Sequence, residues 1–163
     1  MSLLVRKIDR TNWTLSEICS VADIPADAIT NCLRTGGNKM SVWEIKDEAD
    51  IDEAALAIVA TRDHLETFDV VVIEPDFIKE KGITLSPTAV STPVDDLNDT
   101  HLDLCELSYS KLGIIACYVA DRVTHEKVKR YTVVHLKEIL NNAISQGRLK
   151  PGGLKESLRT KLH

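Results

Sequence analysis

The sequence predicts an α/β protein, in which a small, mostly parallel sheet of about three strands is followed by a helical C-terminal lobe that packs on it. Residues 40–45 and 68–73 are compact apolar runs, rich in β-branched and aromatic side chains, that are typical of buried strands. Residues 51–62, between them, repeat apolar side chains at helical spacing. A strand, a helix and a strand within about thirty residues form a βαβ unit, which predicts parallel strands joined by a right-handed crossover.

The N-terminal part of the chain predicts one further strand and two short helices. Residues 3–8 alternate in the way of a strand with one buried face. Thr14, with Glu17 three residues later, has the spacing of a capping box, and residues 26–34 predict a second short helix. The glycine pair in residues 36–41 precedes a strand and lacks the spacing of a phosphate loop, so it predicts a turn.

The C-terminal half is expected to be helical. Residues 82–95 are rich in serine, threonine and proline and predict a linker or a lid. Residues 95–122 predict one long helix, or two helices broken near Gly113. Thr132 is placed to cap a further helix that Gly147 ends, and a last short helix follows the Pro-Gly-Gly segment.

These elements predict an α/β sheet lobe over residues 1–81, a linker or lid over residues 82–95 and a helical lobe over residues 96–163, integrated into one domain. A chain of 163 residues, 44% of them hydrophobic, is long enough to bury a core without disulfide or metal staples. Trp43, in the middle of a predicted strand, is expected to be part of that core.

The composition limits the expected location and partners. The longest nearly apolar stretch, residues 113–120, is much shorter than the about 20 residues of a membrane-spanning helix, and the first residues lack the apolar region of a signal peptide. We therefore expect a soluble cytoplasmic protein without a membrane partner. The aromatic content of 4% disfavours a stacking surface for single-stranded nucleic acid. The cysteines are scattered singly and are expected to be reduced, unreactive thiols: Cys19, Cys32, Cys105 and Cys117.

The net charge of −5 is unevenly distributed along the chain. Residues 44–76 hold eleven acidic and two basic residues, a balance of −9, whereas residues 122–163 hold ten basic and three acidic residues, a balance of +7. We expect the two segments to face each other within one fold or across a dimer, which favours a protein partner or self-association over nucleic acid. Lys155 and Arg159, four residues apart, are expected to reach an acidic surface of the chain itself or of a second copy.

An enzymatic alternative rests on carboxylates that lie at or just after the ends of predicted strands. In open parallel sheets, ligands bind beyond the carboxyl ends of the strands. Carboxylates that converge there would hold Mg²⁺ or Mn²⁺ for the hydrolysis of a phosphoester. The candidate metal ligands are Asp9, Asp47, Glu74 and Asp76. Outside this alternative, no cofactor is expected.

Residues 16–34 have about the length of a helix-turn-helix DNA-binding motif. Asp27, however, lies at the start of the second helix and would repel phosphates, which leaves Asn31 and Arg34 as the DNA-reading residues. A helical hairpin that packs on the sheet is therefore the preferred interpretation.

Histidines offer two further candidate sites, and neither is complete. On a helix, His101 would share a face with Cys105, and Asp99 with Asp103, but two ligands do not make a zinc site. His64 is accompanied by no recognisable nucleophile or oxyanion donor.

No motif in the chain therefore determines a function by itself. The charge polarity, the amphipathic helices and the lack of a complete catalytic constellation favour a non-enzymatic protein-interaction or regulatory module that binds another protein or itself. A metal-dependent phosphoester hydrolase and a helix-turn-helix DNA-binding protein are the alternatives.

Overall fold

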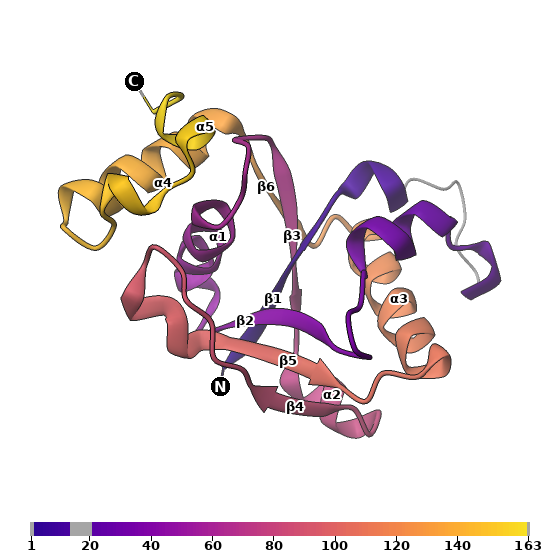
Figure 1. The fold of residues 1–163 in the computed structure, drawn as a ribbon. Helices are drawn as coiled ribbons and strands as arrows, with labels where there is room; N and C mark the ends of the chain where they lie inside the picture. Colours follow the sequence, from indigo (N-terminus) through magenta and orange to yellow (C-terminus); the bar gives the residue numbers. More distant parts are fainter. Residues whose placement is uncertain (1, 14–20, 163) are drawn as a thin grey trace.

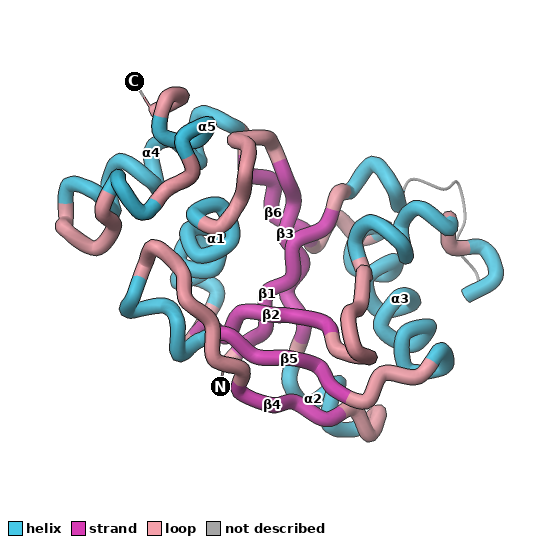
Figure 2. Tube along the Cα trace, viewed as in Figure 1, coloured by secondary structure: helices cyan, strands magenta, loops and turns pink. Residues whose placement is uncertain are grey.

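The computed structural model describes residues 2–13 and 21–162 of the chain. In these residues six strands form one sheet in the order β4-β5-β2-β1-β3-β6. Figure 2 shows the strands side by side, and every neighbouring pair is antiparallel. The strands are β1 (Leu3–Ile8), β2 (Met40–Ile45), β3 (Phe68–Ile73), β4 (Thr84–Pro87), β5 (His101–Cys105) and β6 (Val128–Tyr131).

The predicted small, mostly parallel sheet is therefore wrong. β2 and β3 run in the same direction, since both are antiparallel to β1, but β1 lies between them. Helix α1 (Ile51–Ala60) connects β2 to β3, so the predicted strand, helix and strand are present as a split βαβ unit. The local sequence pattern predicts the connection from β2 through α1 to β3. Contacts between distant parts of the chain place β1 between the two strands.

Three strands lie where the sequence analysis expected none. β4 falls in the segment predicted to be a linker, β5 falls in the segment predicted to be helical, and β6 falls where no element was predicted. In β5, Leu102 and Leu104 contact one core while His101 and Asp103 point to the other face of the sheet. The leucines of this segment also fit helical spacing, and pairing with β2 and β4 on either side decides in favour of the strand.

Helices cover both faces of the sheet, as Figure 1 shows. On one face, α1 packs with α4 (Val133–Ser145) and α5 (Glu156–Arg159) around a core that includes Val5, Trp43 and Phe68. On the other face, α3 (Tyr109–Thr124), α2 (Pro75–Glu80) and the short N-terminal helical turns enclose a second core around Leu4, Val71 and Ile115. The helices of the C-terminal half are therefore divided between the two faces.

Helix α4 confirms the sequence prediction in detail. The Thr132 hydroxyl accepts a hydrogen bond from the backbone N–H of His135 and caps the helix. Leu136 and Leu140 are fully buried, and Gly147 follows the helix with a positive φ of 72°. None of the helices in the described part of the chain is long and apolar enough to cross a membrane.

The cysteines that the structure describes are free, as expected. Cys32 and Cys105 are buried and Cys117 is half-buried. Cys19 lies outside the described residues, as does the predicted capping box of Thr14 and Glu17.

Ion pairs confirm that the acidic and basic segments face each other within one fold. They join Arg122 to Glu74, Lys129 to Asp52, Arg130 to Asp69, Arg148 to Glu53 and Lys155 to Asp63. Burial raises the pKa of Asp52, but hydrogen bonds from Lys129 and Tyr131, with the charges of Lys129 and His135, outweigh burial and hold the pKa of this carboxyl below its ordinary value.

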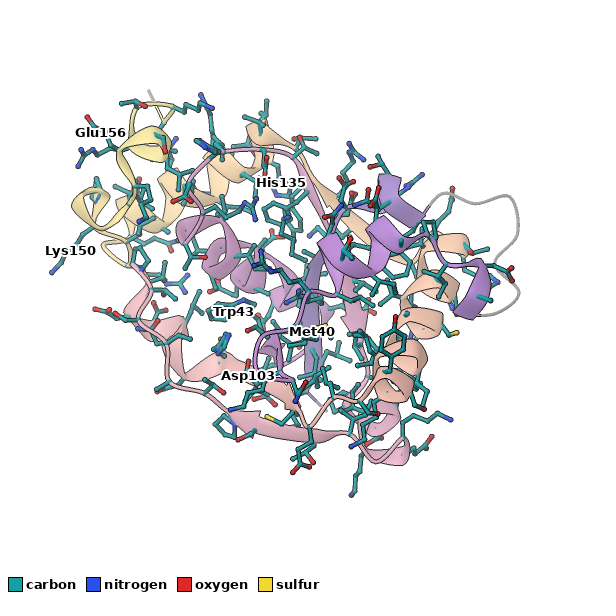
Figure 3. All side chains as sticks on the ribbon, turned by 45° about the vertical axis from the view of Figure 1, so that its right-hand side comes forward. Met40, Trp43, Asp103, His135, Lys150 and Glu156 are labelled. Atoms are coloured by element: carbon teal, nitrogen blue, oxygen red, sulfur yellow. The ribbon has the colours of Figure 1, made fainter. Side chains whose placement is uncertain are left out.

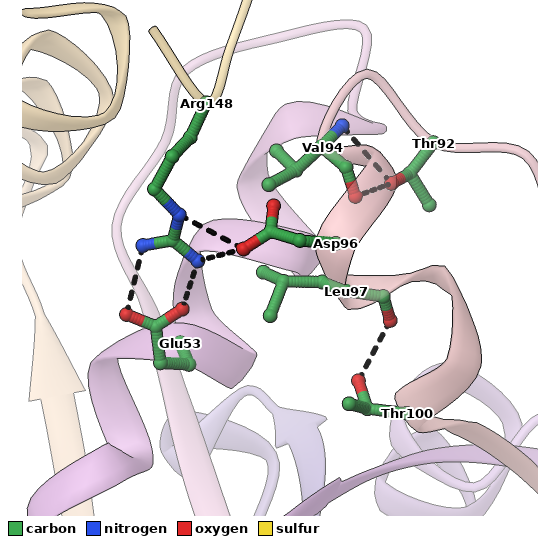
Figure 4. Close-up of polar contacts among 7 residues, drawn as sticks. All are labelled: Glu53, Thr92, Val94, Asp96, Leu97, Thr100 and Arg148. Carbon is green, nitrogen blue, oxygen red and sulfur yellow. Dashed lines mark hydrogen bonds and ion pairs between the residues drawn. The ribbon is translucent and has the colours of Figure 1, made fainter. Parts of the chain in front are cut away.

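Arg148 joins three parts of the chain (Figure 4). Its guanidinium donates to both carboxylate oxygens of Glu53 in α1 and, through Nε at 2.9 Å and Nη2 at 2.7 Å, to Asp96. The hydrogen bond to Glu53 is the largest of the effects that raise the pKa of Arg148 above its ordinary value. The residue lies just after α4, so this contact fixes the end of α4 to α1 and to the turn before β5.

Arg148→Met is expected to lower the free energy of unfolding by about 1–2 kcal/mol, because a bidentate pair is stronger than a single exposed contact yet Glu53 and Asp96 stay partly solvated. Urea denaturation followed by circular dichroism measures this. Arg148→Lys is the matched control, since it keeps the charge and loses the fork, and it should fall between the two proteins. Equal stability of all three at low salt would contradict the prediction.

Candidate anion-binding cleft

A cleft of about 500 Å³ opens at the end of the sheet where β1 ends and β2 begins. Its walls come from the ends of these two strands, from the C-terminal end of α1, and from the segment between the helical turn η3 (Ala28–Cys32) and β2. Four basic side chains line it: Arg6, Lys7, Arg34 and Arg62. We call this feature the basic cleft.

The basic cleft forms because β1 and β2 separate. The pairing of β1 with β2 extends from Leu3 with Ile45 to Val5 with Trp43. Beyond Val5, β1 continues to pair with β3 on its other side and no longer pairs with β2. The Arg6 guanidinium spans the opening. Its Nη1 donates to the carbonyl of Ser41 at 2.7 Å, and its Nε and Nη2 donate to the carbonyl of Cys32 at 3.1 and 2.9 Å.

Arg6 is held by neutral acceptors. Burial lowers the pKa of Arg6, and the neighbouring Cys32 raises it in part. An arginine stays protonated even when it is buried, so its charge is not cancelled by the carbonyls that fix it. The fixed guanidinium therefore contributes a positive potential to the cleft.

Lys7 and Arg62 supply two more charges on the side of the cleft that faces α1. Burial lowers the pKa of Lys7, and the charge of Arg62 lowers it further, although Glu66, Cys32 and Asp9 act in the opposite direction. Arg62 pairs with Glu66, but its Nε is buried and has no hydrogen-bond partner in the described part of the chain. The site thus holds a charge that its surroundings disfavour and a buried donor that is not used.

Arg34 also lines the cleft and lies just before the tight turn that leads into β2. Gly36 and Lys39 exchange both backbone hydrogen bonds, and Gly37 and Asn38 between them have positive φ values of 59° and 60°. These are the conformations of a two-residue type I′ turn, which glycine and asparagine adopt most readily. The turn predicted for residues 36–41 is therefore confirmed.

The basic cleft contains no carboxylate among its described lining residues. Arg6, Lys7 and Arg34 form no ion pair with any carboxylate that the structure describes, whereas Arg122, Arg148 and other basic residues of the C-terminal half do. In a chain of net charge −5, this is a local excess of positive charge.

A buried carboxylate lies next to one cleft residue. Asp103 of β5 is opposite Ser41 of β2 and accepts hydrogen bonds from the Ser41 hydroxyl at 3.1 Å and from the Thr88 hydroxyl at 2.7 Å. Figure 3 shows Asp103 with Trp43, which lines the cleft. Both Asp103 oxygens are used in these contacts, which link β2, β5 and the segment after β4.

The four predicted metal ligands are not brought together by the sheet. The register of β1 places Asp9 beside the beginning of β3, while Asp47 and Glu74 follow the far ends of β2 and β3, beside the beginning of β1. The length of β1, roughly 17 Å at the usual rise per residue, separates the two groups. They would share an end of the sheet only if β1 ran parallel to β2 and β3.

Each of these carboxylates has a local environment of its own. Asp47 accepts the N–H of Ala49 and caps a turn, Asp9 accepts from Thr11, and Glu74 pairs with Arg122. Asp76 is exposed in the first turn of α2. Within the described residues no group of three or more histidine, cysteine or acidic side chains is close enough to hold a metal ion. The Mg²⁺ or Mn²⁺ site stays a prediction without support from this geometry.

The other predicted positions are placed as follows. His101, Asp103 and Cys105 lie on a strand and not on a helix. Lys155 lies 4.0 Å from Asp63 of the same chain, and Arg159 is exposed at the end of α5.

The predicted helix-turn-helix falls partly outside the described residues. Its second helix is present over residues 26–32, which include η3, and ends two residues before the predicted end at residue 34. Asn31 and Arg34, which the sequence analysis selected as the DNA-reading residues, both line the basic cleft.

Sequence reasoning missed Arg6, Lys7 and Arg62 as a site. The adjacent charges of Arg6 and Lys7 in the middle of a predicted strand are visible in the sequence, but they become a signal only because β1 is a central strand, which the structure shows. Comparison of the chain with protein-family models, with curated proteins and with solved structures found no match, so the geometry alone must support a function.

Proposed function

We propose that this protein is a regulatory binding module that takes a phosphate-type anion in the basic cleft. The observation that carries the proposal is that four cationic side chains from separate segments line one cleft without a described carboxylate among them. A bound anion would offset the repulsion between Lys7 and Arg62.

The residue types favour an oxyanion with several oxygens. Arginine presents its donors in a planar fork that matches carboxylates and phosphates, and lysine adds a compact point charge. Arg6 is already fixed by the Cys32 and Ser41 carbonyls, so its orientation needs little further ordering when a ligand binds. The expectation that such a module acts through a protein partner or a second copy of the chain stays part of this proposal.

An alternative role for two of the cations follows from their position. Arg62 follows the C-terminal end of α1, and Lys7 of β1 lines the cleft with it; positive charges near this end are favoured by the helix dipole. If that were their whole role, Lys7 would stabilise the unliganded protein. The lowered pKa of Lys7 points the other way, since the folded state disfavours its charged form.

The test is thermal denaturation of the wild type, Lys7→Met and Lys39→Met with inorganic phosphate, against sodium chloride of the same ionic strength. Lys39 is exposed in the neighbouring turn and does not line the cleft, so it controls for the loss of a positive charge. Phosphate should raise the Tm of the wild type and of Lys39→Met and leave that of Lys7→Met unchanged, because only the folded cleft binds it. Without phosphate, Lys7→Met should melt at or above the wild type.

The effects of Lys7 on stability and on phosphate affinity should change with pH in a defined direction. Because the pKa of Lys7 is lowered in the folded state, its destabilising effect is complete below that pKa and disappears as the pH rises towards the ordinary value of 10.5. Phosphate affinity should fall as the pH passes through the lowered pKa, because the neutral amine no longer attracts the anion. Identical phosphate shifts in all three proteins would refute the site, and a lower Tm of Lys7→Met alone would favour the helix-dipole role.

A further inference from the structure

The basic cleft has a second, apolar part. Val5, Trp43 and Ile58 line it together with the four cations. Val5 and Lys7 lie on the same face of β1, the one covered by α1, so apolar and cationic surfaces are adjacent along one strand. A ligand that fills the cleft would therefore contact both kinds of surface.

The volume of the cleft also exceeds what a small inorganic ion requires. Cavities of about 300–1,000 Å³ are typical of sites for small organic molecules, and this cleft, at about 500 Å³, falls in that range. An inorganic phosphate held by the cations would leave the space beside Trp43 to water.

Trp43 is fixed in place as an apolar wall. It is 9% exposed, and its ring meets the His101 ring edge to face, with centroids 4.9 Å apart and planes at 71°. His101 is in turn held by the Thr88 carbonyl, 3.2 Å from its Nδ1. The small exposed part of this indole is an ordered surface against which a flat apolar group can pack.

We infer that the natural ligand is a small phosphate monoester whose apolar ring lies against Trp43 while its phosphate is held by Lys7 and Arg62, within the positive potential of the fixed Arg6 guanidinium. This inference rests on the proposed anion-binding function. A phosphate monoester carries a charge of about −1.5 to −2 near neutral pH and presents three terminal oxygens, whereas a carboxylate carries one charge on two oxygens. The phosphate group matches a site of several separate cations better.

The experiment compares phenylphosphonate, methylphosphonate and benzoate by calorimetric titration of the wild-type chain. The two phosphonates share a head group and differ only in the organic part, and benzoate keeps the ring and replaces the head. Phenylphosphonate should bind roughly tenfold tighter than methylphosphonate, which corresponds to removing about 60 Å² of apolar surface from water. It should also bind tighter than benzoate, and Lys7→Met should lose binding of both phosphonates.

A tryptophan reporter locates the ring. The chain has two tryptophans, so Trp13→Phe leaves Trp43 as the only fluorophore and Trp43→Phe leaves Trp13, which belongs to the other core. Phenylphosphonate should change the emission of Trp13→Phe and leave that of Trp43→Phe unchanged. If a variant does not fold, the affinity ratios of the wild type still decide the question.

The outcomes separate the two proposals. Equal affinity for both phosphonates would overturn the ring contact and leave the anion-binding function standing. Benzoate binding as tightly as phenylphosphonate would overturn the preference for phosphate. Binding of none of the three would refute the proposed function together with this inference.

Discussion

Trp43→Ala is expected to lower the free energy of unfolding by about 3–5 kcal/mol, the largest effect of any single substitution predicted for this chain. The side chain is 9% exposed and belongs to the core between the sheet and α1, and its ring packs on His101. Removing it leaves a cavity that the fixed strands around it cannot close. For a domain whose total stability is typically about 5–15 kcal/mol, this loss would reduce or abolish soluble expression.

Urea denaturation followed by circular dichroism checks the effect of Trp43→Ala. Trp43→Phe is the matched control, since it keeps an aromatic ring and should lose less stability. An unchanged denaturation midpoint with lost phenylphosphonate binding would contradict the core assignment and would make Trp43 a surface binding residue only.

Arg6→Met is expected to lower the free energy of unfolding by about 2–4 kcal/mol, because the carbonyls of Cys32 and Ser41 would lose their donor where the chain is partly buried. The guanidinium also bridges the opening between β1 and β2, so this end of the sheet should become more mobile. Removing a charge that burial disfavours offsets part of the cost.

Hydrogen exchange of the amides near Ser41, together with denaturant titration, measures this effect of Arg6→Met. Arg6→Lys should give an intermediate result, because it keeps the charge and loses the two-sided contact. Greater stability of Arg6→Met than of the wild type would show that the bridge is not needed to hold the strands. Lys7→Met is expected to raise the free energy of unfolding instead, which separates the fixed arginine from a lysine whose charge is disfavoured by burial and by Arg62.

Local sequence signals predicted the elements whose side chains satisfy one dominant pattern. β1, β2 and β3 were predicted with their observed bounds, and α4 was predicted with its cap and its terminating glycine. The acidic and basic segments were predicted to pair, and they do so within one chain. Periodicity and capping depend only on a few neighbouring residues. The attraction between segments of opposite net charge acts over long distances, whatever the strand order.

The strand order and the site could not be obtained in this way. A strand of β1's composition can pair on either side and in either direction, and the helical spacing of the leucines around Leu102 and Leu104 hid β5 until pairing with β2 and β4 decided its conformation. Likewise, Asp9, Asp47 and Glu74 would share an end of the sheet only if β1 were parallel to its neighbours.

The sequence by itself determined most local elements, the burial of Trp43 and the pairing of its charged segments. Only the tertiary structure decided that β1 is inserted between β2 and β3, that it separates from β2 beyond Val5, and that Arg6, Lys7, Arg34 and Arg62 therefore line one cleft. The physical reason is that hydrogen bonding between strands and the burial of two sheet faces depend on residues far apart in the chain, and the free energy of these contacts has no counterpart in any local pattern.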